Sequence, residues 1–154
     1  MIILGYQGIG KSSLAGSNNC IDLESGNFWV DGIRRDDWYK PYCKIANHLS
    51  EQGYTVFVSS HEVVRKELEE SNEDVVVIFP SLELKEQWIE KLKKRYDTTK
   101  LEKDFKALAN AEDRYEDNIK ELMCGNLPYH EIRDINYDLK EIVNLLHTVE
   151  RSST

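Results

Sequence analysis

The feature that most constrains this chain is a glycine-rich octapeptide that directly follows its first apolar run. Residues 5–12 read Gly-Tyr-Gln-Gly-Ile-Gly-Lys-Ser, and the residues before them are Met-Ile-Ile-Leu. The octapeptide fits G-x-x-x-x-G-K-[ST] at every fixed position, a pattern typical of a turn that joins a buried strand to a helix and cradles phosphate groups. The sequence therefore predicts a strand at Ile2–Gly5 that leads into a phosphate-binding loop.

Each residue type in this loop suits that chemistry. Gly8 and Gly10 let backbone N–H groups turn inward and approach phosphate oxygens closely. Lys11 brings a positive charge to the β- and γ-phosphates, and Ser12 offers a hydroxyl to Mg²⁺ at the start of a helix. A chance match is disfavoured by the apolar strand before the loop and the helical pattern after it. We expect ATP and Mg²⁺ as cofactors, bound by Gly8, Ile9, Gly10, Lys11, Ser12 and Ser13.

Apolar runs alternate with helical patterns along the rest of the chain. The expected strands are residues 2–5, 20–23, 54–59 and 75–79, with a weaker fifth candidate at 129–135. The expected helices are residues 11–16, 36–52, 61–70, 82–96, 103–123 and 137–150. This alternation predicts one α/β domain over residues 1–154, with a parallel sheet and helices on both of its faces. Residues 151–154 are expected to form a flexible tail.

Charge and composition narrow the classes of partner. The net charge of −8 disfavours binding along a nucleic-acid backbone. Residues 85–106 are the exception, with eight lysines and arginines against five acids. This stretch is either an anion-facing patch or a solvated helix face with ion pairs. No apolar run approaches the roughly 20 residues that span a bilayer, and no secretory leader pattern is present, so we expect no membrane partner. Three cysteines without metal-type spacing are expected to be reduced and mostly buried, which favours a cytoplasmic protein.

Two carboxylates follow the second expected strand, in Ile-Asp-Leu-Glu at residues 21–24. Ligands of open parallel sheets lie outside the carboxyl ends of the strands, and residues two apart on a strand share a face. Asp22 and Glu24 can therefore hold a Mg²⁺-bound water and orient or deprotonate an acceptor hydroxyl. The alternative is a pair of solvated strand-end carboxylates.

An acid that commonly holds the metal in P-loop proteins is missing from the later strands. The third and fourth apolar runs end in Ser-Ser and Pro-Ser rather than in Asp or Glu, at residues 59–60 and 80–81. The base-reading N-K-x-D segment of GTPases is also absent. Both absences disfavour a motor-type ATPase and a GTPase switch.

With these features the chain resembles the nucleoside-monophosphate-kinase-like P-loop kinases. The acids after the second strand are similar to those of the shikimate/gluconate-kinase branch, and the small size is similar to that of phage-encoded nucleoside-monophosphate-type kinases. The resemblance covers the chain well to about Arg95 and the later part by architecture. It implies a P-loop NTPase fold with a five-stranded sheet of order 2-3-1-4-5, an acceptor-binding segment, and a mobile lid at about residues 91–106.

The resemblance also implies roles for individual residues. Asp22 corresponds to the metal-water or acceptor carboxylate, with Glu24 as its partner. Arg65 stands where such kinases often place an acceptor-binding arginine. Lys91 and Arg95 lie four residues apart in the expected lid, where both could reach the transferring phosphoryl group, although the family commonly has arginine at the position of Lys91.

The segment between the second strand and the next helix is where the acceptor docks in this family. It holds Arg34 and Arg35 beside Phe28 and Trp29, so that an aromatic ring can stack on a base while an arginine binds a phosphate. The alternatives are a surface loop for this segment, and surface ion pairs for Arg65 and Arg95.

These observations lead to one expected function and two alternatives. The expected function is transfer of the γ-phosphoryl group of ATP to a small acceptor, above all a (deoxy)nucleoside monophosphate, with Lys11, Asp22 and Arg95 as catalytic residues. One alternative is a polynucleotide 5′-hydroxyl kinase, which is the one form in which nucleic acid is expected as a partner. The other is a nucleotide-binding regulatory or interaction protein without turnover.

Overall fold

We describe the fold from a computed structural model of the chain. The structure describes residues 1–14, 19–23, 30–71 and 74–152, and for residues 12, 13 and 150–152 it describes the backbone only. The strands are β1 (Ile2–Gly5), β2 (Cys20–Asp22), β3 (Thr55–Val58), β4 (Val75–Pro80) and β5 (Tyr129–Ile132). The helices are α1 (Lys11–Leu14), α2 (Tyr39–Glu51), α3 (Glu62–Ser71), the 3-10 helix η2 (Leu82–Leu84), α4 (Lys85–Thr99), α5 (Glu102–Met123) and α6 (Leu139–Ser152).

The five strands form one parallel sheet in the order β2-β3-β1-β4-β5. This confirms the predicted strand direction and strand order, including the weak fifth strand. β1 occupies the centre, where Ile3 pairs with Phe57 of β3 on one side and with Val76 of β4 on the other. Because all strands run the same way, the segments that follow β1, β2, β3 and β4 meet at one edge of the sheet.

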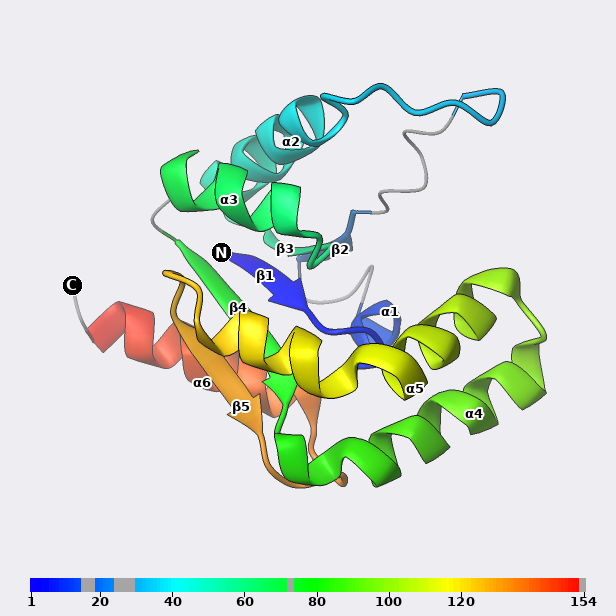
Figure 1. The fold of residues 1–154 in the computed structure, drawn as a ribbon. Coiled ribbons are helices and arrows are strands. Elements are labelled where there is room, and N and C mark those ends of the chain that lie inside the picture. Colours follow the sequence, from blue (N-terminus) through cyan, green and yellow to red (C-terminus); the bar gives the residue numbers. More distant parts are fainter. Residues whose placement is uncertain (15–18, 24–29, 72–73, 153–154) are drawn as a thin grey trace.

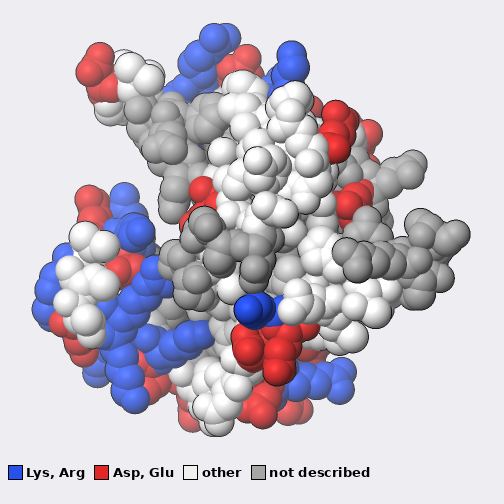
Figure 2. Space-filling view, turned by 180° about the vertical axis from the view of Figure 1, so that it is seen from behind, with Lys and Arg blue, Asp and Glu red and all other residues white. Residues whose placement is uncertain are grey.

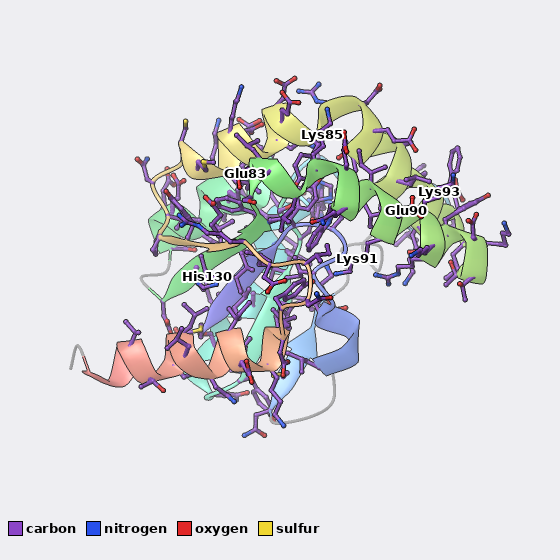
Figure 3. All side chains as sticks on the ribbon, turned by 90° about the horizontal axis from the view of Figure 1, so that it is seen from below. Glu83, Lys85, Glu90, Lys91, Lys93 and His130 are labelled. Atoms are coloured by element: carbon purple, nitrogen blue, oxygen red, sulfur yellow. The ribbon has the colours of Figure 1, made fainter. Side chains whose placement is uncertain are left out.

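Helices cover both faces of the sheet, as predicted. Figure 3 shows the sheet between α5 on one side and α1 and α6 on the other. Figure 1 shows α2 and α3 side by side, and α4 and α5 as a hairpin that extends away from the sheet. Right-handed crossovers explain this distribution. The chain crosses the sheet in one direction from β1 to β2 and in the other direction in the later connections, so the connecting helices lie on opposite faces. None of the described helices is both long and apolar enough to cross a membrane.

The core is built from the three central strands and the helix faces turned toward them. Every residue of β1, β3 and β4 is buried, as expected for strands covered on both sides. Trp88, Tyr42 and Tyr115 are the largest fully buried side chains contributed by the helices. Cys20 and Cys43 are buried as predicted, whereas Cys124 is exposed, and all three are free thiols.

Ile45 and Phe105 are large apolar residues that are exposed on the helices. Ile45 is 41% exposed because the buried face of α2 runs through Tyr42, Cys43 and Ala46. Phe105 is 53% exposed because α4 and α5 have left the sheet at this point, and the ring packs on Tyr96 instead of on the core.

The break between α4 and α5 lies later than the sequence predicts. Residues 97–99 were expected to interrupt the helix, but α4 continues through Thr99 and ends at Lys100, which has a left-handed backbone with φ of 55°. α5 follows after Leu101 and contains a non-helical residue, Arg114. At the end of the chain, α6 continues to Ser152, two residues into the expected tail at 151–154, and residues 153–154 lie outside the described residues.

Candidate functional site

A cleft of about 760 Å³ opens at the carboxyl edge of the sheet. It is bounded by the glycine-rich loop after β1, the end of β2, the segment between β3 and α3, and the α4–α5 hairpin. Its charged lining residues are Lys11, Asp22, Glu62, Arg65, Arg95, Lys103, Asp104, Lys106 and Glu121. The cleft therefore gathers residues from five separate parts of the sequence at the place where parallel sheets bind ligands.

The glycine-rich loop, residues 5–12, needs its glycines for two measurable reasons. Gly8 and Gly10 have φ of 88° and 97°, a region that residues with a side chain rarely adopt. A Cβ atom on Gly8 would also lie 2.8 Å from Cδ2 of Leu92 and 3.2 Å from Nε1 of Trp88. The loop thus packs directly against α4, a contact that the octapeptide pattern does not reveal.

Two side chains contact the loop from outside the cleft, and a third contacts one of them. The Trp88 indole N–H donates to the Gln7 carbonyl over 2.9 Å, and the Tyr137 hydroxyl donates to the Ile9 carbonyl over 2.6 Å. The ammonium of Lys91 donates to the Tyr137 hydroxyl over 2.7 Å.

Lys91 therefore faces Tyr137, and it is not among the residues that line the cleft. In Figure 3 it points from α4 toward the middle of the molecule, whereas Glu90 and Lys93 lie on the exposed side of the helix. Burial, followed by the charge of Arg95, lowers the pKa of Lys91 to about 8. The structure separates the contacts of Lys91 from those of Arg95, which lines the cleft. Lys91 contacts Tyr137 and Trp88 here, and its expected role toward the acceptor or the phosphoryl group stays a prediction.

Lys11 and Asp22 meet inside the cleft. Lys11 begins α1, Asp22 ends β2, and the ammonium nitrogen lies 3.8 Å from a carboxylate oxygen. The Asp22 side chain is 10% exposed. This position brings the two residues together as the sequence suggests. Ser12 and Ser13 lie in α1, where the structure describes their backbone only, and Glu24 lies outside the described residues, as do Phe28 and Trp29.

Arg65 lies at the wall of the cleft, where it is held at two points. Its Nε donates to the Ser60 carbonyl over 3.1 Å, and its terminal nitrogen pairs with Glu121 of α5. The guanidinium lines the cleft, although only 12% of its side chain is exposed. The sequence predicted Arg65 as a site residue, but it did not identify Glu121, which is 56 residues away in the chain.

Arg95 also lines the cleft and is paired with a carboxylate. Its Nε lies 3.1 Å from Asp104, whose side chain is buried and also accepts a hydrogen bond from Thr99. Lys103 and Lys106 follow on α5 and line the same side of the cleft. Figure 2 shows lysine and arginine side chains gathered over the hairpin. Several of them are ion-paired, as expected for a solvated helix face, and the anion-facing interpretation stays a prediction.

A group of amide side chains links the loop to α5. Asn110 accepts hydrogen bonds from Gln7 and from Asn118, each over 2.9 Å. All three amide side chains line the cleft. Asn110 and Asn118 lie on either side of the non-helical Arg114. Gln7 occupies a variable position of the loop pattern, so the sequence contained no signal for this contact.

The expected acceptor segment is only partly beside the cleft. The Arg34 guanidinium lies 4.0 Å from the centre of the Trp38 ring, and that ring packs edge-on against His61, which lines the cleft. Burial, then the charges of Arg34 and Lys11, lower the pKa of His61. Arg35 is 85% exposed and pairs with Asp37, which matches a surface ion pair.

The donor set available for a metal is small. Among the described residues, no group of three histidine, cysteine, aspartate or glutamate side chains is placed to hold an ion. Mg²⁺ bound with a nucleotide needs only one or two protein ligands, because phosphates and waters supply the rest. Asp22, at the cleft wall, fits that requirement. Comparison with protein families and with curated proteins finds no match to this sequence.

Proposed function

We propose that this protein is an ATP-dependent phosphotransferase with a P-loop NTPase fold of the nucleoside-monophosphate-kinase-like kind. The observation that carries the proposal is the shared cleft: the glycine-rich loop and Lys11 line it together with Asp22, Arg65 and Arg95. A cleft that presents five lysine and arginine side chains, besides four acids, beside a loop with backbone N–H groups suits a triphosphate. The expected acceptor is a (deoxy)nucleoside monophosphate.

The proposed reaction needs positioning and charge neutralisation rather than covalent catalysis. The bond between the γ-phosphorus and the bridging β–γ oxygen breaks while the γ-phosphorus bonds to an acceptor oxygen, and ADP leaves. Lys11 binds the phosphates, and Arg95 stabilises the charge that develops on the transferred group. Ser12 and Asp22 would hold Mg²⁺, which supplies further neutralisation of the phosphate charge. With a hydroxyl acceptor, Asp22 also receives or orients the departing proton.

Two pairings in the cleft support a phosphate-bearing acceptor. Arg65 is held against Ser60 and Glu121, so its fork is already fixed at the cleft wall. Arg34 is held on Trp38 at the edge of the same cleft. Arg65 thus suits the phosphate of the acceptor, and Arg34 suits the part of the acceptor that lies at the edge of the cleft. We place the reaction in the cytoplasm, where the free thiols of Cys20 and Cys43 stay reduced.

The test is a coupled assay of ADP release, run across nucleoside monophosphates, shikimate-like hydroxy acids and 5′-hydroxyl oligonucleotides. Acceptor-dependent release with a nucleoside monophosphate supports the proposal. Release only with an oligonucleotide would show a polynucleotide 5′-hydroxyl kinase, and tight ATP binding without release would show a binding protein.

Nucleotide binding is tested separately by isothermal titration with Mg·ATP. Lys11→Ala is expected to weaken binding by about 100-fold or more, since it removes a charge-assisted contact inside the cleft. Lys93→Ala is the matched control, because Lys93 is exposed on α4 and does not line the cleft. Equal affinity of wild type and Lys11→Ala would remove the phosphate-binding role of the loop.

A further inference from the structure

The loop at residues 5–12 can point its peptide groups in two directions, and something must select one. A trans peptide is planar, so the carbonyl of one residue and the N–H of the next point opposite ways. In the Gln7–Gly8 and Ile9–Gly10 peptides the second residue is glycine, which accepts positive and negative φ almost equally. The glycine after each peptide therefore accepts either orientation of that peptide. The octapeptide by itself does not fix which side its N–H groups face.

Two hydrogen bonds from outside the cleft act on these two peptides. The Trp88 indole donates to the carbonyl of Gln7, whose peptide carries the N–H of Gly8. The Tyr137 hydroxyl donates to the carbonyl of Ile9, whose peptide carries the N–H of Gly10. Both carbonyls are therefore turned toward α4 and the segment before α6. The N–H groups of Gly8 and Gly10 consequently point away from Trp88 and Tyr137.

The two donors form one unit with Lys91. The rings of Trp88 and Tyr137 are stacked, with their centres 5.8 Å apart and an angle of 17° between their planes. The Lys91 ammonium lies 4.2 Å from the Trp88 ring centre and 4.6 Å from that of Tyr137. It also donates to the Tyr137 hydroxyl, so that oxygen directs its own proton to the loop, where the Ile9 carbonyl at 2.6 Å is nearer than the Gly8 carbonyl at 3.5 Å.

This chain of donors is polarised in one direction. Lys91 donates to Tyr137, and Tyr137 donates to Ile9, so each bond strengthens the next. Burial raises the pKa of Tyr137, so its hydroxyl keeps the proton that it donates. The charge of Lys91 is thereby linked to the peptide that carries the Gly10 N–H.

We propose that Trp88 and Tyr137 are positioning residues that orient the peptides before Gly8 and Gly10, so that both N–H groups face the bound phosphates, with Lys91 directing the Tyr137 proton. This inference rests on the proposed binding of nucleotide by the loop. It assigns a role to three residues that the octapeptide pattern does not include.

The first test needs no ligand and uses an assigned spectrum of the ¹⁵N-glycine-labelled protein. Tyr137→Phe keeps the stacked ring and removes only the hydroxyl, so a shift or splitting of the Gly10 resonance reports a reoriented peptide. Tyr115→Phe is the matched control, since it also removes a 2.7 Å hydroxyl-to-carbonyl bond, here to Ser81. We expect the Gly10 resonance to change in Tyr137→Phe and to stay in place in Tyr115→Phe. An unchanged Gly10 resonance in Tyr137→Phe overturns the proposal.

The second test measures affinity for Mg·ATP by isothermal titration. Tyr137→Phe is expected to weaken binding about tenfold, the effect of about one hydrogen bond. Tyr129→Phe makes the same chemical change on β5, outside the cleft and the loop contacts, and should leave affinity unchanged. Lys91→Met should weaken binding in the same direction as Tyr137→Phe, whereas Lys93→Met should not. Unchanged affinity in both Tyr137→Phe and Lys91→Met overturns the proposal, even where the thermal midpoint has dropped.

The two tests also separate this inference from the proposed function. Failure of the wild-type protein to bind Mg·ATP would overturn the proposed function, whereas the glycine spectrum would still test the orientation of the peptides. Tight wild-type binding with no effect of Tyr137→Phe would overturn the positioning role alone. Trp88 is fully buried, so a substitution there can prevent folding. The decision therefore rests on Tyr137→Phe and Lys91→Met.

Discussion

The two halves of α4 have different surroundings, although they form one continuous helix. The inner half contacts the glycine-rich loop: Trp88 bonds to Gln7, and Leu92 lies where a side chain on Gly8 would be. The outer half contacts the hairpin partner α5, through Arg95 with Asp104 and Tyr96 with the exposed Phe105. We therefore expect this helix to move at its outer end, which lies away from the core, and to stay fixed where it contacts the loop.

This difference narrows the expected lid at residues 91–106. Lys91 and Leu92 belong to the fixed half, because one is bonded to Tyr137 and the other is buried. Arg95 and the residues after it belong to the outer half, where we expect a motion that leaves the loop undisturbed. Closure would therefore be a motion of the outer hairpin, with the loop already held in place.

The largest effect is expected where the fixed half meets the loop, at Gly8. Gly8→Ala places a Cβ 2.8 Å from Leu92 and forces φ of 88° on alanine. Strain and overpacking together cost about 2–4 kcal/mol, so the free energy of unfolding in urea should fall by that amount. Affinity for Mg·ATP should fall by about 100-fold or more as the loop shifts.

Gly53→Ala is the control for Gly8→Ala. Gly53 has a similar φ of 96°, but a Cβ there meets no atom within 4 Å. It should lose only the strain part, about 1–2 kcal/mol, and keep its affinity. Equal losses in the two variants would show that α4 does not press on the loop, and the comparison between the two halves would no longer hold.

The next effect concerns Asp22, which stands opposite the mobile half and beside Lys11. Asp22→Asn should lower turnover by about 100-fold, the scale of a lost acid, base or metal-binding group. The carboxylate lies at the cleft wall rather than in the core, so the thermal midpoint should change little. Turnover within about a factor of two of wild type would assign Asp22 to a solvated strand end.

A smaller effect is expected at Arg95 in the mobile half. Arg95→Ala should lower the maximal rate by about tenfold or more while changing ATP affinity by about twofold or less, because its contact matters most in the transition state. Hydrogen exchange should slow at residues 95–106 when ATP and acceptor bind together, whereas residues 85–92 should already exchange slowly without ligand. Ligand-independent exchange along the whole hairpin would contradict the division of α4.

Much of this fold could be predicted from sequence because its signals are local. The alternation of apolar runs and helical patterns fixed the parallel sheet, and the octapeptide fixed where β1 ends. The end of α4 was predicted at residue 96, but the helix continues to Thr99. The turn into α5 depends on the left-handed backbone of Lys100 rather than on helix propensity. The apolar side chain of Phe105 is exposed because α5 lies away from the sheet at this position.

The sequence predicted those site residues that belong to a local motif or directly follow a strand. Lys11 and Asp22 follow directly from strand ends, and the structure places them in one cleft. Tyr137 touches the loop from 128 residues away, and Glu121 reaches Arg65 from another helix. Such contacts depend on how the helices pack, and a single sequence does not encode that packing in any local pattern.

The smallest effect concerns His61, on the opposite side of the cleft from the hairpin. Its pKa is lowered first by burial and then by the charges of Arg34 and Lys11. The unfolded chain therefore binds a proton more readily than the folded one below about pH 6.5, and stability should fall as the pH is lowered through that value. His61→Phe keeps a ring against Trp38 and removes the titration, so its stability should fall less over the same range.

The pKa of His61 can also report whether a ligand binds beside Lys11 or nearer the α4–α5 hairpin. Phosphates bound beside Lys11 would offset the positive charges that depress the pKa of His61, so Mg·ATP should raise that pKa. The shift can be followed by NMR titration of the imidazole resonances, and Lys11→Ala should raise the pKa in the same direction without ligand. Arg95→Ala should not, because Arg95 is not among the charges that act on His61. A pKa of His61 that is unchanged by saturating Mg·ATP would place the triphosphate away from Lys11, nearer the mobile hairpin, and the loop would then lose its assigned ligand.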